Sequence, residues 1–124
     1  MSKLTKVLLG SLLAVVLATG SASATMTWSR SLKVGSKGSD VKDLQVFLNM
    51  CADTKVASVG AGSPGYETTT FGPATKAAVI KWQAARGVTP ASGLFGPMSR
   101  AKAADLQAST NVCGGGQSNN NNNN

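Results

Sequence analysis

The hydrophobic and polar positions of the chain predict three helices. The first is indicated by Val41, Leu44, Leu48 and Cys51, which are spaced three or four residues apart. Apolar residues at this spacing form one stripe along a helix and can pack on a core. We therefore expect a helix over about residues 40–51.

Polar residues at the start of this stripe also favour a helix. Ser39 is suited to cap the first turn, and Asp40 places a negative charge where the helix dipole favours an anion. The preceding run 35–38 reads Gly-Ser-Lys-Gly, which is typical of a turn. The first helix is therefore expected to follow a turn directly.

Proline and glycine mark the second helix. Pro73 follows Gly72 and suits the first helical position, where its missing N–H loses no hydrogen bond, and Gly87 suits a left-handed end. This helix is expected over about residues 73–86, with Lys76 and Lys81 off its apolar stripe. The stripe itself contains Thr75, Val79, Trp82 and Arg86.

The third helix is predicted in the same way. Gly96-Pro97 opens it, and it is expected to reach about residue 107. Residues 52–70 show no sustained period, and only a short extended piece is expected at 66–71. Because loops often carry binding residues, 52–70 is a candidate functional region.

A seven-residue motif occurs twice, 24 positions apart. Residues 71–77 read Phe-Gly-Pro-Ala-Thr-Lys-Ala, and residues 95–101 read Phe-Gly-Pro-Met-Ser-Arg-Ala. The aromatic residue can anchor a loop in the core, glycine permits the bend and proline begins the helix. A weaker repeat relates residues 41–45 to residues 79–83. Structural roles are therefore expected for Phe71, Gly72, Phe95 and Gly96.

Residues 1–24 have the pattern of a removable signal peptide. Lys3 and Lys6 precede an apolar run, and residues 22–24 read Ala-Ser-Ala, which suits a signal peptidase. The run has about 12 apolar residues, fewer than the roughly 20 needed to span a bilayer, so no stable membrane insertion is expected after cleavage. The mature protein is expected to be secreted or held in the cell envelope.

Export bears on the two cysteines, Cys51 and Cys113. Beyond the cytoplasm such a pair is expected to form a disulfide, which would stabilise the fold by roughly 4 kcal/mol, and two free thiols are the alternative. The domain is expected to occupy residues 25–113. Residues 114–124, rich in Gly and Asn, are expected to form a flexible tail.

The composition limits the possible chemistry. Histidine is absent, which excludes Ser-His-Asp catalysis and zinc sites built on imidazole. Among the five carboxylates only Asp53 and Glu67 fall in loops, and glycan cleavage needs two carboxylates across one bond. We expect no catalytic residues, no metal and no cofactor, and therefore a protein that is not an enzyme.

Together these motifs resemble the peptidoglycan-binding-like domain family, a small three-helix module of exported bacterial cell-wall proteins. The resemblance covers about residues 32–104. It is carried by Leu32, Gly35, Gly38, Val41, Leu44, Gln45, Phe71, Gly72, Thr75, Ala78, Val79, Trp82, Gln83, Gly87, Val88, Gly93, Phe95, Gly96 and Ser99.

The sequence departs from the family pattern in three places. The usual Asp-Gly pair before the aromatic residue is replaced by residues 68–69, Thr-Thr, and by residues 92–93, Ser-Gly. Ser99 stands where threonine is usual, and the loop 52–70 is longer than typical. These departures concern ligand contacts rather than the fold.

The resemblance implies an all-α fold, a small three-helix bundle with long loops, and noncatalytic binding of bacterial peptidoglycan. Sugar faces stack on aromatic rings, and amides of the wall hydrogen-bond to polar side chains. Trp82 is a stacking candidate, but it stands at the position of Leu44 in the weaker repeat, so core packing is expected. The expected ligand contacts, with Gln83 as a support, are Tyr66, Thr68, Thr70, Gln83 and Arg86.

Charge and fold permit other partners. The formal net charge is +7, which would suit either nucleic acid or an anionic wall polymer as a partner. The cations are scattered and the protein is expected to be exported, so no nucleic-acid partner is expected. An envelope structural or protein-interaction domain that keeps the fold without glycan binding is the alternative function.

Overall fold

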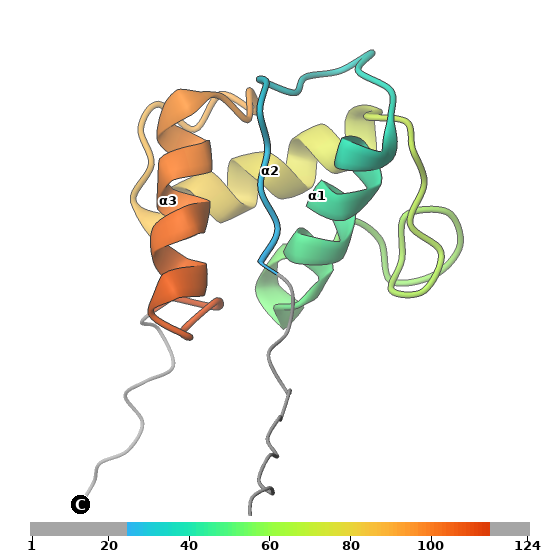
Figure 1. The fold of residues 1–124 in the computed structure, drawn as a ribbon. Helices are drawn as coiled ribbons and strands as arrows, with labels where there is room; N and C mark the ends of the chain where they lie inside the picture. The colour runs from blue at the N-terminus through green and yellow to red at the C-terminus, as the bar shows by residue number, and fades with distance from the viewer. Residues whose placement is uncertain (1–24, 115–124) are drawn as a thin grey trace, which may run out of the picture.

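The computed structural model describes residues 25–114, and the predicted signal peptide and most of the predicted tail lie outside them. The elements are α1 (Ser39–Asn49), the short 3-10 helix η2 (Ala52–Thr54), α2 (Pro73–Arg86) and α3 (Pro97–Ala108), as Figure 1 shows. No β-strand is present among residues 25–114. The predicted all-α fold with three helices and long loops is confirmed.

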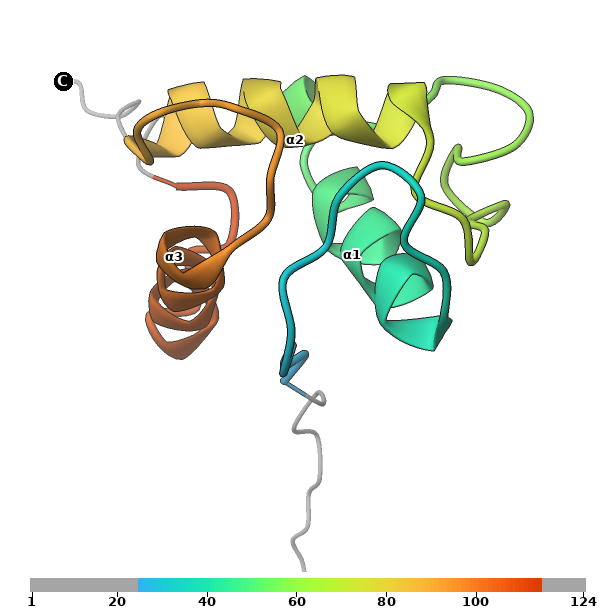
Figure 2. The same cartoon turned by 90° about the horizontal axis from the view of Figure 1, so that it is seen from above.

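Helix α2 is the base on which the other helices lie. Figure 2 shows α1 and α3 on the same side of α2, with the chain segment that precedes α1 passing between them. Trp28 and Leu32 of this segment are buried in the core. None of the helices within residues 25–114 has the length and apolar character to cross a membrane.

The helix boundaries agree with the predictions at α2 and nearly at α3, but they differ at α1. Gly38, with φ of 143°, takes the capping position predicted for Ser39, and Ser39 is the first helical residue. The helix ends at Asn49 because Cys51 is already extended. Gly87 ends α2 in the left-handed conformation, φ 77°, as predicted.

The extended piece predicted at 66–71 is a single bridge rather than a strand. Both Phe-Gly-Pro motifs hydrogen-bond through their backbone to the segment before α1. Phe95 exchanges two bonds with Leu32, at 2.9 and 3.0 Å. The N–H of Phe71 donates to Ser36, while the N–H of Gly35 donates to the carbonyl of Phe71. The segment 32–37 therefore joins the two motifs.

Four aromatic rings form the centre of the core. Trp28, Phe47, Trp82 and Phe95 contact one another in a closed circuit, with ring centroids 5.1–5.7 Å apart and mostly edge to face. Such pairs are stabilising beyond the area they bury. The core position expected for Trp82 is confirmed. The role of Trp28 was not predicted, because no helical or strand period surrounds it.

A disulfide between Cys51 and Cys113 closes the domain, as predicted. It joins the residue before η2 to the chain after α3, and the two Cα atoms are 5.5 Å apart. The pairing therefore connects the start of a loop to the end of the described domain.

Candidate functional site

A buried glutamine on α1 organises the loop before α2. The carboxamide nitrogen of Gln45 donates to the carbonyl of Thr70 at 3.1 Å and to the hydroxyl of Thr75 at 3.0 Å. Its oxygen accepts the N–H of Thr68 at 2.6 Å. Gln45 is 1% exposed, so these bonds satisfy a polar group that would be costly to bury alone.

Gln83 on α2 does the same for the loop before α3. Its nitrogen donates to the carbonyl of Leu94 at 2.8 Å and to the hydroxyl of Ser99 at 3.0 Å. Its oxygen accepts the N–H of Gly93 at 2.9 Å. Thr70 and Leu94 each precede the phenylalanine of a motif by one residue, so the contacts of the two carboxamide nitrogens are equivalent. The oxygens differ, because one accepts from Thr68, three residues before its phenylalanine, and the other from Gly93, two residues before. The repeats of the sequence therefore correspond to a repeated polar frame.

Each frame borders a surface hollow. The hollow beside the first motif, about 220 Å³ in volume, is called the first groove here. The hollow beside the second motif, about 150 Å³, is called the second groove. The first groove is lined by Gln45, Val56, Ala61, Gly62, Thr68, Thr70, Gly72, Pro73, Ala74 and Thr75. The second groove is lined by Gln83, Val88, Thr89, Pro90, Ser92, Leu94, Gly96, Pro97, Met98 and Ser99.

Three of the predicted contact residues lie at the first groove or next to it. Thr68 and Thr70 line it, and Thr70 is exposed. Tyr66 is 69% exposed, and its carbonyl accepts the N–H of Gly62, another lining residue, at 2.8 Å. The backbone of Tyr66 therefore adjoins the first groove, and its exposed ring belongs to the same loop without lining the groove.

Gln83 and Arg86, the other two predicted contacts, are buried. Arg86 is 8% exposed and forms a two-pronged ion pair with Asp53, at 2.9 and 3.2 Å. A Cβ added to Gly114 would lie 2.8 Å from Cδ of Arg86, so the C-terminal segment covers this side chain. Both residues support loops, and Gln83 also lines the second groove.

The ion pair between Arg86 and Asp53 holds η2 against the end of α2. The hydrogen bond from Arg86 holds the pKa of Asp53 below its ordinary value, against a smaller opposing effect of burial. Asp53 itself is more than half exposed, whereas Arg86 is not. The arrangement fixes a loop and leaves the guanidinium out of contact with the surface.

Asn49 and Glu67 fix the loop 55–70 through side-chain hydrogen bonds. The Asn49 amide nitrogen donates to the carbonyl of Gly62 at 2.9 Å and to the Glu67 carboxylate at 2.8 Å. Its oxygen accepts the N–H of Val56. Burial raises the pKa of Glu67, but the bonds from Asn49 and from the Gly65 N–H outweigh this effect and leave the pKa lowered. An asparagine at a helix end carries no sequence pattern that would have identified this role.

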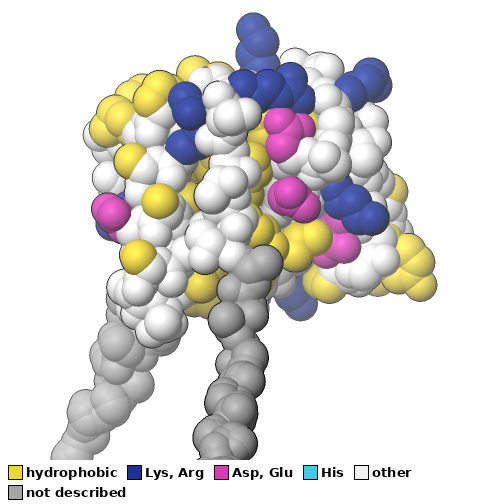
Figure 3. Space-filling model, viewed as in Figure 1, with side chains coloured by type: hydrophobic (Ala, Val, Ile, Leu, Met, Phe, Trp, Pro, Cys, Tyr) yellow, Lys and Arg dark blue, Asp and Glu magenta, His cyan; other side chains and the backbone are white. Residues whose placement is uncertain are grey.

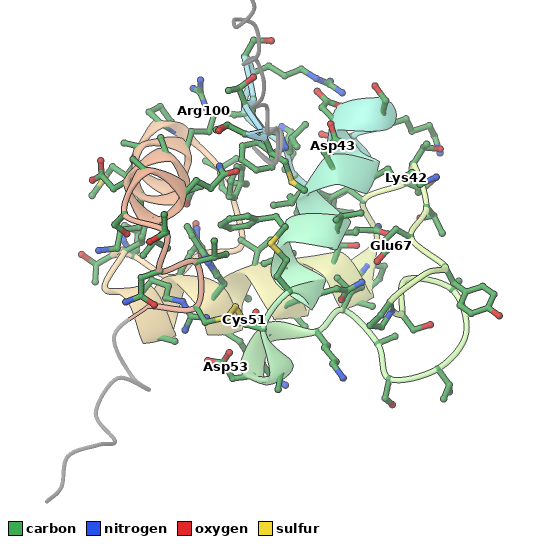
Figure 4. All side chains as sticks on the ribbon, turned by 60° about the horizontal axis from the view of Figure 1, so that its bottom comes forward. Lys42, Asp43, Cys51, Asp53, Glu67 and Arg100 are labelled. Atoms are coloured by element: carbon green, nitrogen blue, oxygen red, sulfur yellow. A yellow bond between two sulfur atoms is a disulfide. The ribbon has the colours of Figure 1, made fainter. Side chains whose placement is uncertain are left out.

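The acidic residues do not come together. Figure 4 shows Asp53 by η2, apart from Glu67, which faces α1 near Lys42. Among residues 25–114 no three His, Cys, Asp or Glu side chains are grouped so that they could hold a metal ion. The sequence places no such residue outside this range.

Comparison with known proteins shows a partial match to an enzyme. No family model matches the chain. The chain is 40% identical over 98 residues to a zinc D-Ala-D-Ala carboxypeptidase of Streptomyces albus G. The match covers 73% of this chain and 35% of that protein, so the chain spans about a third of its relative's length.

This match corrects one prediction. The absence of histidine and of a facing carboxylate pair led us to expect that the protein is not an enzyme, and the relative is named as an enzyme. The prediction is therefore wrong as a statement drawn from composition. The zinc in the relative's name does not fit this chain, because the donors described above are scattered and both cysteines are in the disulfide.

Proposed function

We propose that this chain binds bacterial peptidoglycan through the first groove and Tyr66. The observation that carries the proposal is the hollow edged by Thr68 and Thr70 on the loop that also presents the exposed Tyr66. Two further points support it, namely the family resemblance of the sequence and the partial match to a protein named for D-Ala-D-Ala. The relative's name supports a cell-wall ligand for this chain.

The groove suits a sugar. The ring of Tyr66 can cover an apolar sugar face, and the threonine hydroxyl groups can exchange hydrogen bonds with hydroxyl and N-acetyl groups. Gly72 leaves the edge of the groove open, because no atom lies within 4 Å of where its Cβ would be. The frame around Gln45 fixes Thr68 and Thr70, so little order has to be gained on binding.

The location of the ligand agrees with the expected export. A peptidoglycan-binding protein has to act in the envelope or outside the cell. Exposed cations would add attraction to anionic wall polymers, and this attraction is screened by salt. Binding that depends on the groove should persist at about 0.3 M salt, where charges more than roughly 6 Å apart are largely screened.

The test is co-sedimentation of the oxidised protein with purified sacculi freed of anionic polymers, across a salt series. Two variants address the groove: Tyr66→Ala removes the ring, and Ala74→Glu fills the groove with a charged chain. Ala77→Glu is the matched control, because it adds the same charge to an exposed position of α2 outside the groove.

We expect each groove variant to weaken retention by about tenfold, corresponding to one lost contact of about 1.4 kcal/mol, and Ala77→Glu to bind like the native protein. Circular dichroism should show all variants folded. Equal retention of the native protein and both groove variants would remove this site assignment. Absence of salt-resistant binding by the native protein would overturn the proposed function itself.

A further inference from the structure

The second groove carries bulkier apolar side chains than the first at two equivalent positions, although both linings are mainly apolar and both contain serine or threonine hydroxyl groups. Leu94 stands where the first groove has Thr70, and Met98 stands where it has Ala74. Hydroxyl and small groups are thus replaced by large apolar side chains. The repeat therefore keeps the shape of the binding frame and changes what the frame can bind.

The lining of the second groove is mainly apolar and partly exposed. Leu94 is 43% exposed and Met98 is 62% exposed, and Val88, Pro90 and Pro97 complete the apolar lining. Figure 3 shows hydrophobic side chains gathered over the start of α3 and the loop before it. A hollow of about 150 Å³ accommodates small groups such as methyls.

A second hollow of about 450 Å³ adjoins this groove and carries positive charge. We call it the cationic hollow; it shares Ser92 and Leu94 with the second groove. Its remaining lining residues are Lys33, Val34, Lys76 and Gly93. Figure 3 shows a cluster of Lys and Arg side chains along the same edge of the molecule as the apolar patch.

The position of Lys76 is fixed by the second loop. A Cβ added to Gly93 would lie 2.7 Å from Cγ of Lys76, so the lysine stem lies directly against the Gly93 backbone. Among residues 25–114, neither Lys33 nor Lys76 has a carboxylate within salt-bridge distance. Their charges are available to an anion from outside.

We propose that the second groove and the cationic hollow together bind the free C-terminal end of a peptidoglycan stem peptide. The carboxylate would lie between Lys33 and Lys76, and the methyl side chains of the terminal alanines would pack on Leu94 and Met98. This inference rests on the proposed function. It adds a second site, which would bind a different part of the same ligand. A neutral sugar would use the apolar lining alone and leave the lysines without a partner, and an inorganic anion would use only the lysines.

The test is a nuclear magnetic resonance titration of the isotope-labelled, oxidised full chain with N-acetyl-D-Ala-D-Ala. We expect the backbone amides of residues 92–98 to shift and those of residues 66–75 to remain unchanged. The same dipeptide with a C-terminal amide lacks the carboxylate, and it should bind about threefold more weakly, as befits a partly exposed ion pair. Lys76→Met keeps the stem and should give a similar loss.

Met98→Glu introduces a negative charge into the second groove and should reduce dipeptide affinity at least tenfold. Ala101→Glu is the matched control, because it adds the same charge one turn later on an exposed position outside the groove. Equal affinity for the acid and the amide, or shifts confined to the first groove, would overturn the inference.

The two proposals fail separately. If sacculi bind with salt resistance and Ala74→Glu weakens this binding while the dipeptide causes no shift at residues 92–98, the proposed function stands and the second site is wrong. If the dipeptide shifts residues 92–98 but sacculi do not bind, the second groove recognises carboxylate-terminated peptides, and its assignment to the wall is overturned. Peptide-free glycan strands should leave residues 92–98 unshifted.

Discussion

At the scale of single residues, Arg86 is a buried cation whose partner is half in solvent. Its side chain is 5% exposed, whereas the Asp53 side chain is 57% exposed. Removing the partner leaves a charge in the interior with little solvent to compensate it. The cost of losing this ion pair therefore arises mainly from the buried charge of Arg86.

Asp53→Asn should lower the free energy of unfolding at pH 7 by about 1–2 kcal/mol. The value is below that for a fully buried pair, because solvent screens the exposed carboxylate. The measurement is urea unfolding followed by tryptophan fluorescence. Asp105→Asn, on an exposed part of α3, is the control and should change stability little.

The contribution of Asp53 to the free energy of unfolding should depend on pH in a defined direction. The pKa of Asp53 is lowered in the folded protein, so its contribution is complete above the unfolded pKa near 3.9 and is lost as the pH falls through the folded pKa. Acidification from about pH 5 to pH 2 should therefore destabilise the native protein more than Asp53→Asn. If the free energy of unfolding fell in parallel with pH for the native protein and for Asp53→Asn, this role of Asp53 would be contradicted.

The sequence shows which interactions a side chain can make, but the role of that side chain in the fold was harder to predict. Trp82, Gln83 and Arg86 lie within about one turn and offer an aromatic ring, an amide and a cation, which is also the composition of a sugar-binding surface. All three are buried, since the loops before α3 and after it pack over this face of α2. The residue types indicate which interactions are possible, and packing by the loops before and after α3 determines which of them form.

At the scale of elements, the long loop depends on covalent and polar fastening. Residues 55–70 contain little regular structure, and their bonds run to Asn49 and Gln45 on α1. The disulfide begins just before this loop and ends after α3. Reducing it would free both the start of the loop and the segment that covers Arg86.

The double variant Cys51→Ser, Cys113→Ser should lower the free energy of unfolding by about 3–4 kcal/mol. Closing a loop of 62 positions restricts the unfolded chain, and a small domain has only about 5–15 kcal/mol of stability in total. Thermal unfolding of the variant and the oxidised native protein measures the difference. Native protein kept reduced should melt with the variant, and a difference below about 1 kcal/mol would contradict the prediction.

The elements themselves were largely predictable where local chemistry was decisive. Gly-Pro pairs locate the starts of α2 and α3, and Gly87 locates the end of α2, because each acts within a few residues. The start of α1 was placed one residue late because Gly38, not Ser39, adopts the capping conformation. The loop 55–70 could not be predicted, since its shape depends on contacts with α1 that are distant in sequence.

At the scale of the whole molecule, the repeat has a consequence that neither copy has alone. The segment 32–37 pairs with both motifs, so the two grooves are held on one rigid domain. Wall polymers repeat as well, and a rigid pair of sites can engage one polymer at two places. Under the two proposals above, retention on sacculi then reflects both sites acting together.

The double variant Ala74→Glu, Met98→Glu tests this coupling. Each single variant should reduce retention on intact sacculi by about tenfold, and the double variant should reduce it to background, because no site remains to keep the protein near the polymer. The matched double control is Ala77→Glu, Ala101→Glu, which occupies equivalent exposed positions of the same two motifs. On soluble dipeptide only Met98→Glu should matter. Retention of the double variant equal to that of Ala74→Glu alone would mean that the second groove adds nothing to wall binding.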